Sequence, residues 1–209
     1  MTRKYLLLVL LASAAPAMAN VYSVSIDTSS LSGPGSLFFS FGPGVSPFDP
    51  ATATVSGFSG GGTLGSTIPS GAGILPGTLV LSNAAPATYQ QAITYDGSKI
   101  HFLFSLTGPA ISSPNPGAAG GTDFALFLLD GSDNALLTDD PNGSVFDASI
   151  APGTGAVSFA TFQPAVVLIS AVPEPSSFLL LMGGVALIGA RLRRCTTAAL
   201  NLTSRLPAA

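Results

Sequence analysis

The chain has 209 residues, of which 47% are hydrophobic and only 8% are charged, and its formal net charge is −3. All nine aspartates lie between residues 20 and 171, where Lys99 is the only base, so this segment carries a net charge of −8. Because nucleic-acid binding needs positive charge against the phosphates, this balance excludes nucleic acid as a partner.

The N-terminus has the three parts of a secretory signal peptide. Arg3 and Lys4 precede the apolar run 5–15, and Ala17-Met18-Ala19 has the small-x-small form of a cleavage site. We therefore expect residues 1–19 to be removed by signal peptidase, with Ala17 and Ala19 forming the site. The single cysteine, Cys195, lies far from this segment, so the exported part is expected to fold without a disulfide bond.

Residues 20–171 predict a single all-β domain. Apolar residues recur at every second position in short runs that are separated by Gly, Pro, Ser and Asn, the pattern of β-strands. These runs are Tyr22–Ile26, Leu37–Phe41, 51–58, 78–82, Tyr89–Tyr95, Ile100–Leu106, Phe124–Leu128, 145–150 and 157–162. About eight to ten strands at this spacing predict an antiparallel β-sandwich or jelly roll. No stretch before Pro173 combines helical periodicity with helix caps.

Glycine, proline and aspartate predict the turns and loops that connect the strands. Asp96-Gly97 stands between two alternating runs, which favours a β-hairpin at this point. The segments Gly33-Pro34-Gly35 and Gly42-Pro43-Gly44 are expected to end the run between them, and residues 108–121 to form a proline-rich loop. The glycine-rich segment 57–77 fits either a long loop or an edge strand, and 162–171 fits either a last strand or a linker.

Two glycine-rich motifs and one histidine are the candidates for catalysis in this sequence. Residues 57–61 satisfy G-x-S-x-G and residues 60–65 satisfy G-x-G-x-x-G, but loop-forming residues follow both where a helix is needed. His101 is the only histidine, so any Ser-His-Asp mechanism would have to use it. Since His101 lies between Ile100 and Phe102, we expect it on the solvent side of a strand, and we expect no enzyme activity and no ordinary zinc site.

The aspartates are the remaining candidates for chemistry. Asp130, Asp133, Asp139 and Asp140 are crowded on two short polar segments, and their carboxylates predict a possible Ca²⁺ site, although the spacing is not that of an EF-hand. The same residues are ordinary turn formers. They also allow a glycosidase pair, but this segment has no glutamate, no tryptophan and only three tyrosines for contacts with sugar rings.

The stretch 172–194 joins three features in a fixed order. Pro173-Glu174-Pro175 is held extended by its prolines, an uncharged apolar run follows at 178–190, and Arg191, Arg193 and Arg194 close it. This arrangement resembles the PEP-CTERM sorting signal of exported bacterial proteins, which is read by exosortase, a membrane-embedded cysteine protease or transpeptidase.

The resemblance implies a role for each part. It makes Pro173, Glu174 and Pro175 the recognition motif, 178–190 a single transmembrane helix that anchors the chain transiently in the inner membrane, and the three arginines a stop-transfer cluster. Residues 195–209 are then a short cytoplasmic tail.

The resemblance also guides the expected function. Residues 20–171 are similar to a group of PEP-CTERM proteins whose exported domain has no assigned activity. The implied role is a non-enzymatic protein of the cell surface or extracellular matrix, associated with exopolysaccharide. A carbohydrate-binding β-sandwich is the alternative, and a secreted hydrolase is a third possibility.

Overall fold

The computed structural model describes residues 20–69 and 72–172. The expected signal peptide 1–19, the expected sorting segment from Pro173 onward and the expected tail 195–209 lie outside the described residues. Within the described part of the chain, no helix has the length and apolar character needed to span a membrane. The chain divides into two units, 1–172 and 173–209, and the architecture below is that of the first.

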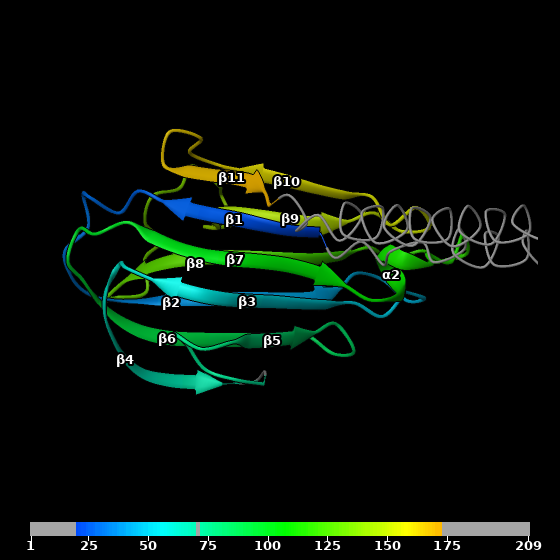
Figure 1. Ribbon diagram of the computed structural model, residues 1–209, viewed down its shortest axis with the longest axis horizontal. Helices are drawn as coiled ribbons and strands as arrows, with labels where there is room; N and C mark the ends of the chain where they lie inside the picture. The colour runs from blue at the N-terminus through cyan, green and yellow to red at the C-terminus, as the bar shows by residue number, and fades with distance from the viewer. Residues whose placement is uncertain (1–19, 70–71, 173–209) are drawn as a thin grey trace, which may run out of the picture. The chain divides into compact units, whose positions relative to one another are not determined.

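Between residues 20 and 172, excepting 70 and 71, eleven strands form two antiparallel sheets, which Figure 1 shows lying one behind the other. The five-stranded sheet has the order β11-β1-β7-β3-β5, built from Val167–Ala171, Asn20–Ile26, Ile100–Thr107, Thr52–Ser59 and Leu79–Ser82. The six-stranded sheet has the order β10-β9-β8-β2-β6-β4, built from Val157–Thr161, Phe146–Ile150, Thr122–Asp130, Gly33–Pro43, Ala87–Tyr95 and Gly62–Pro69. The prediction of an all-β sandwich is confirmed.

The core lies between the sheets because the apolar side chains of both alternate inward. Strand β7 is buried at Ile100, Phe102, Phe104 and Leu106, with the intervening residues exposed or half-buried. Aromatic rings fill the layer from both sides: Phe104 of the five-stranded sheet lies 4.4 Å, centroid to centroid, from Phe124 of the six-stranded sheet. Residues 20–172 contain no cysteine, so this packing holds the sheets together without a disulfide bond.

The predicted hairpin at Asp96-Gly97 is wrong. Strand β6 pairs with β2 and β4, whereas β7 pairs with β1 and β3, so the turn carries the chain from one sheet to the other. Alternation could not separate the two cases, because a hairpin and an inter-sheet turn both direct the apolar face of each strand into the core. Gly97 has a φ of 79°, and Asp96 Oδ1 accepts the N–H of Ser98 at 2.9 Å, so the local turn chemistry is as expected.

Strand β2 ends at Pro43, as Gly42-Pro43-Gly44 predicted, but it includes Gly33-Pro34-Gly35, which was expected to break it. Pro34 is tolerated because it pairs only with Thr94 of β6, since the pairing with β8 begins one residue later at Gly35. A Cβ on Gly35 would meet the carbonyl oxygen of Leu129 at 2.2 Å and the ring of Tyr95 at 2.4 Å. Glycine here therefore permits close approach of two chains and does not end the strand.

Two open alternatives are settled, and one loop gains a helical turn. Residues 62–69 form β4, the glycine-rich edge of the six-stranded sheet, and residues 167–171 form β11, the edge of the other. The expected loop 108–121 contains α2, a single turn at Pro109–Ser112. Buried Gln91 fixes the irregular β4, because its Nε2 donates to the carbonyl oxygen of Gly65 at 2.7 Å while its Oε1 accepts the Tyr89 hydroxyl at 2.7 Å.

Candidate functional site

The most informative site is the edge where the folded domain meets residue 173. Strand β11 pairs with β1 alone, from Ile26↔Val167 to Tyr22↔Ala171. The pairing continues one residue beyond the strand, since the N–H of Val172 donates to the carbonyl oxygen of Val21 at 2.8 Å. Backbone pairing on this edge therefore continues to Val172, the last described residue.

Strand β11 is held mainly by this hydrogen-bonded pairing. Only Val167 is buried, whereas Leu168 is 68% exposed and Ser170 and Ala171 face solvent. Half-buried Ile169 packs against the core. An edge strand with one buried side chain has a low local cost of opening compared with the central strands.

The beginning of the described chain lies beside this edge. Asn20 is the first residue of β1 and stands opposite Leu106, while Tyr22 stands opposite Ala171. The predicted cleavage residues Ala17 and Ala19 lie outside the described residues. The described domain therefore begins and finishes on adjacent strands of one sheet.

The four aspartates of the predicted calcium site serve the loop between β8 and β9. Asp130 Oδ1 accepts the N–H groups of Ser132 at 2.8 Å and Asn134 at 2.9 Å, and its Oδ2 accepts from the Asn134 side chain at 2.9 Å. The hydrogen bonds from Asn134 and Ser132 lower the pKa of Asp130.

The other three carboxylates are arranged separately. Asp140 Oδ2 accepts the Ser144 hydroxyl at 2.7 Å, which lowers its pKa, Asp139 Oδ1 accepts from Gln163 at 3.3 Å, and Asp133 has a φ of 61° in the turn. Among residues 20–69 and 72–172, no three acidic, histidine or cysteine side chains gather as a metal site. The calcium site stays a prediction.

One carboxylate that sequence reasoning did not single out has an unusual environment. Asp147 lies on the outward side of β9, and its Oδ1 is buried without a hydrogen-bond partner in the described structure. Burial raises the pKa of Asp147, and the charges of Asp140 and Asp123 raise it further. Its position alternates with buried Phe146 and Ala148, so periodicity predicted only a solvent-facing residue.

His101 faces solvent on β7 as predicted, and the structure places Ser59 opposite it in the register of β3 and β7. Ser59 is the serine of the G-x-S-x-G pattern, a juxtaposition that only strand pairing reveals. No hydrogen bond joins these two exposed side chains in the described structure. The nearby carboxylate of Asp27 accepts the N–H of Ser29 at 3.1 Å and contacts Lys99 Nζ at 3.1 Å, and these contacts lower its pKa to about 2.

The glycine patterns do not open helices. Gly60 and Gly61 connect β3 to β4, and residues 62–65 are the start of β4 itself. A nucleophile elbow and a dinucleotide-binding turn both need a helix at this point. The segment therefore serves as an inter-sheet connection, with positive φ angles of 77° at Gly60 and 81° at Gly61.

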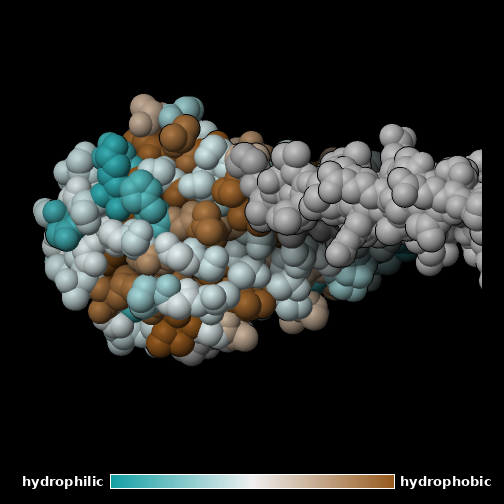
Figure 2. All heavy atoms as spheres, in the orientation of Figure 1, coloured by the Kyte–Doolittle hydropathy of each residue, from teal (hydrophilic) through white to brown (hydrophobic). Residues whose placement is uncertain are grey.

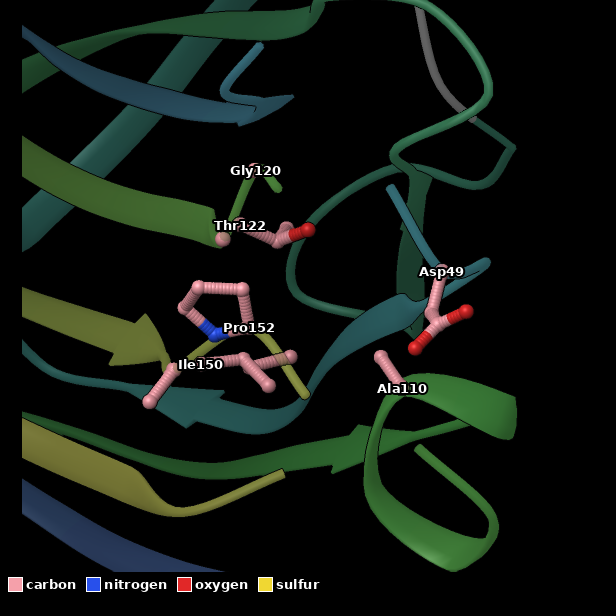
Figure 3. Close-up of a pocket in the computed structure, with 8 residues that line it drawn as sticks. Asp49, Ala110, Gly120, Thr122, Ile150 and Pro152 are labelled. Atoms are coloured by element: carbon pink, nitrogen blue, oxygen red, sulfur yellow. The ribbon is translucent and has the colours of Figure 1, made fainter. Parts of the chain in front are cut away.

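The hollows of the described surface are small or shallow. Figure 3 shows one between Asp49, Ala110, Thr122 and Ile150, with a volume of about 10 Å³, room for a single water molecule. A broader depression of about 380 Å³ lies along β5 and is lined by Thr52, Ala72, Val80, Ser82 and 84–87. No titratable side chain lines the broader depression.

An aromatic pair on the outward face of the six-stranded sheet was also missed. Half-buried Phe38 and Phe127 stand opposite each other on β2 and β8, with ring centroids 5.5 Å apart. Gln90 stands opposite Phe38 on the other side, and its Nε2 donates to Ser36 Oγ at 3.1 Å. In the sequence each of the two phenylalanines lies within an apolar run. Alternation predicts that both point outward, but it does not predict that they form a pair.

Comparison with known proteins identifies the segment that follows the edge strand. Residues 171–194 match the family model described as PEP-CTERM protein-sorting motif. The match begins at the last residue of β11 and includes the predicted Pro173-Glu174-Pro175 and the three arginines. No curated protein matches the chain, and no solved structure matches its fold.

Proposed function

We propose that this chain, whose PEP-CTERM motif marks it as an exported protein processed by exosortase, is a non-enzymatic protein of the cell surface or matrix that associates with exopolysaccharide. The observation that carries this proposal is the position of the motif immediately after a complete β-sandwich. Every strand of both sheets precedes Pro173. Cleavage at or beyond this residue therefore leaves the folded domain whole, as sorting of a working domain requires.

The outward faces support a role in surface contact. Hydroxyl side chains line the outer face of the five-stranded sheet, which Figure 2 shows toward the viewer: Ser23, Ser25, Thr52, Thr54, Ser56, Ser105 and Thr107. Hydroxyls both donate and accept hydrogen bonds, so such a face suits the hydroxyls of a polysaccharide. Ser59 and His101 are exposed, and no hydrogen bond joins their side chains in the described structure, which favours contact over catalysis.

The sorting part of the proposal is tested by replacing Pro173, Glu174 and Pro175 together with alanine. The variant is expected to stay in the inner membrane at precursor size, because the extended recognition segment is lost. A matched variant, Thr196→Ala with Thr197→Ala, changes the tail and is expected to be processed normally. Release of the triple variant at the wild-type size and level would contradict the proposal.

A carbohydrate-binding module is the second candidate, and the Phe38–Phe127 pair favours it. A half-buried aromatic pair flanked by an amide combines apolar surface with hydrogen-bonding groups. The purified domain, residues 20–172, would show saturable binding on a glycan array, and Phe38→Ala would weaken it. Binding unaffected by Phe38→Ala and Phe127→Ala would remove this face from consideration.

A further inference from the structure

Both ends of the domain and four connecting segments gather at one end of the sandwich, called here the termini end. It consists of residues 44–51, 83–86, 108–121 and 151–156. Hydrogen bonds join its segments: Ala110 N–H to Pro50 O at 3.0 Å, Gly44 N–H to Gly121 O at 2.8 Å and Asn83 N–H to Ala51 O at 3.1 Å. The pairs Asn20↔Leu106 and Tyr22↔Ala171 place the beginning of β1 and the end of β11 here, at the right in Figure 1.

The opposite end, called here the distal end, consists of residues 27–32, 96–99, 131–145 and 162–166. The pairs Ile26↔Ile100 and Gly35↔Asp130 place these segments where the strands finish on the other side. The Lys99–Asp27 ion pair also lies here. In Figure 2 the deepest hydrophilic colour of the visible face gathers at this end, on the left.

The charges are divided unequally between the two ends. The termini end contains one charged residue, Asp49, whose carboxylate accepts the N–H of Asn115 at 2.7 Å. Exposed Asp123, the second residue of β8, lies beside this end, opposite Gly42. The distal end, of nearly equal length, contains six: Asp27, Asp96, Lys99, Asp133, Asp139 and Asp140. Proline, alanine and glycine dominate the termini end, and Val45 is 68% exposed there. A body with a net charge of −8 thus presents only two of its nine aspartates, Asp49 and the neighbouring Asp123, at the end where the described domain begins and finishes.

The short connection between the domain and residues 178–190 makes the position of the charges important. The last hydrogen bond of the domain is made by Val172, and the sorting motif starts at once, so a chain held in a membrane by residues 178–190 holds its domain within a few residues of the lipid. A surface that carries anionic lipids repels aspartates that lie within a Debye length, about 8 Å. Each carboxylate there would cost about a fivefold loss in the population that faces the surface.

We propose that the termini end is a membrane-facing surface: while the chain is anchored, this weakly charged end lies against the anionic lipid headgroups and the more acidic distal end points away. The inference rests on the anchoring part of the proposed function and adds the surface that docks and its partner. It explains why an acidic domain tolerates attachment to the membrane without a spacer.

The test uses the full chain, with Cys195→Ser, reconstituted in protein-free vesicles of phosphatidylcholine with or without phosphatidylglycerol. A fluorophore is placed at Ala85→Cys on the termini end or at Ser132→Cys on the distal end, and energy transfer to headgroup-labelled lipid is measured. The eight residues of β7 alone separate the ends by roughly 26 Å. Strong transfer from residue 85 and weak transfer from residue 132 are expected in both vesicle types.

Charge variants then test the cause. Val45→Asp with Ala119→Asp adds two exposed carboxylates to the termini end and is expected to lower transfer from residue 85 only in anionic vesicles. The matched pair Ser30→Asp with Ala165→Asp, at the distal end, is expected to change nothing. The melting temperature of each variant is measured first, so that unfolding is not mistaken for reorientation.

Three results would overturn the inference. Equal transfer from residues 85 and 132 in a firmly anchored chain contradicts the orientation, and an unchanged signal for the Val45 and Ala119 variant in anionic vesicles contradicts the electrostatic cause. Removal of the chain from vesicles by alkaline carbonate is different, since it contradicts the anchoring itself and thereby the proposed function on which the inference depends.

Discussion

Truncating Phe124 to alanine is expected to remove a large fraction of the domain's stability, because its ring joins the two sheets. Phe124 is fully buried, and its centroid lies 4.4 Å from Phe104 and 5.7 Å from Phe146. Loss of a phenylalanine ring from a packed core costs about 3–5 kcal/mol. Since a domain of this kind has about 5–15 kcal/mol in total, the variant should still fold in water but unfold at much lower urea.

A double-mutant cycle makes this prediction specific to the arrangement of the sheets. Phe104→Ala and Phe124→Ala, measured singly and together by urea unfolding of residues 20–172, should show a coupling free energy of about 0.5–1.5 kcal/mol. Leu103→Ala is the matched control, because Leu103 is 41% exposed on the outward side of β7, and it should cost under about 1 kcal/mol. Additive losses from Phe104 and Phe124 would refute the facing of β7 and β8 across the core.

Three further predictions concern polar groups. Asn83→Ala should lower the free energy of unfolding, measured in urea, by about 2–4 kcal/mol. Buried Asn83 accepts the N–H of Ala51 at 2.7 Å and donates to Asp49 O and Thr122 Oγ1. Asn134→Ala, the control, should cost far less. Asp147→Asn should stabilise the domain at pH 7, because burial raises the pKa of Asp147 and so penalises its charged form. The gain in stability should become smaller in acid, where Asp147 of the folded wild-type domain is protonated. A gain that does not depend on pH would contradict the reasoning. Ca²⁺ and Mg²⁺ at equal ionic strength should raise the melting temperature equally, since Asp130 and Asp140 already accept loop hydrogen bonds; a Ca²⁺-specific rise of about 5–10 °C abolished by Asp130→Ala would establish a site.

The strands could be predicted because half-buried strands show their period in sequence. The burial of β7, with residues 100, 102, 104 and 106 inside, repeats the alternation of its letters. The partners of each strand could not be predicted in this way. Strands β6 and β7 both direct apolar residues into one core, and only long-range pairing assigns them to different sheets. The same limit hid the approach of Ser59 to His101.

The prediction of a strand break from glycine and proline was wrong at residues 33–35, where tertiary contacts explain the glycine. Gly35 is required by the closeness of Leu129 and Tyr95, and neither contact is visible within a local window. The sorting segment was the opposite case, because its recognition depends on a contiguous order of residue types. Residues 171–194 were therefore identifiable from sequence, while the sheet edge that leads into them was not.

The most direct test of sorting by exosortase is to follow the unmodified chain in two host strains that differ only in possession of the enzyme. Pulse-labelled protein is fractionated, and its intact mass is determined. In the strain with exosortase, we predict a product that lacks the segment after the sorting motif, outside the inner membrane and with the β-sandwich 20–171 intact. In the strain without it, the chain should remain in the inner membrane with residues 173–209 attached. The same mass and location in both strains would contradict the account.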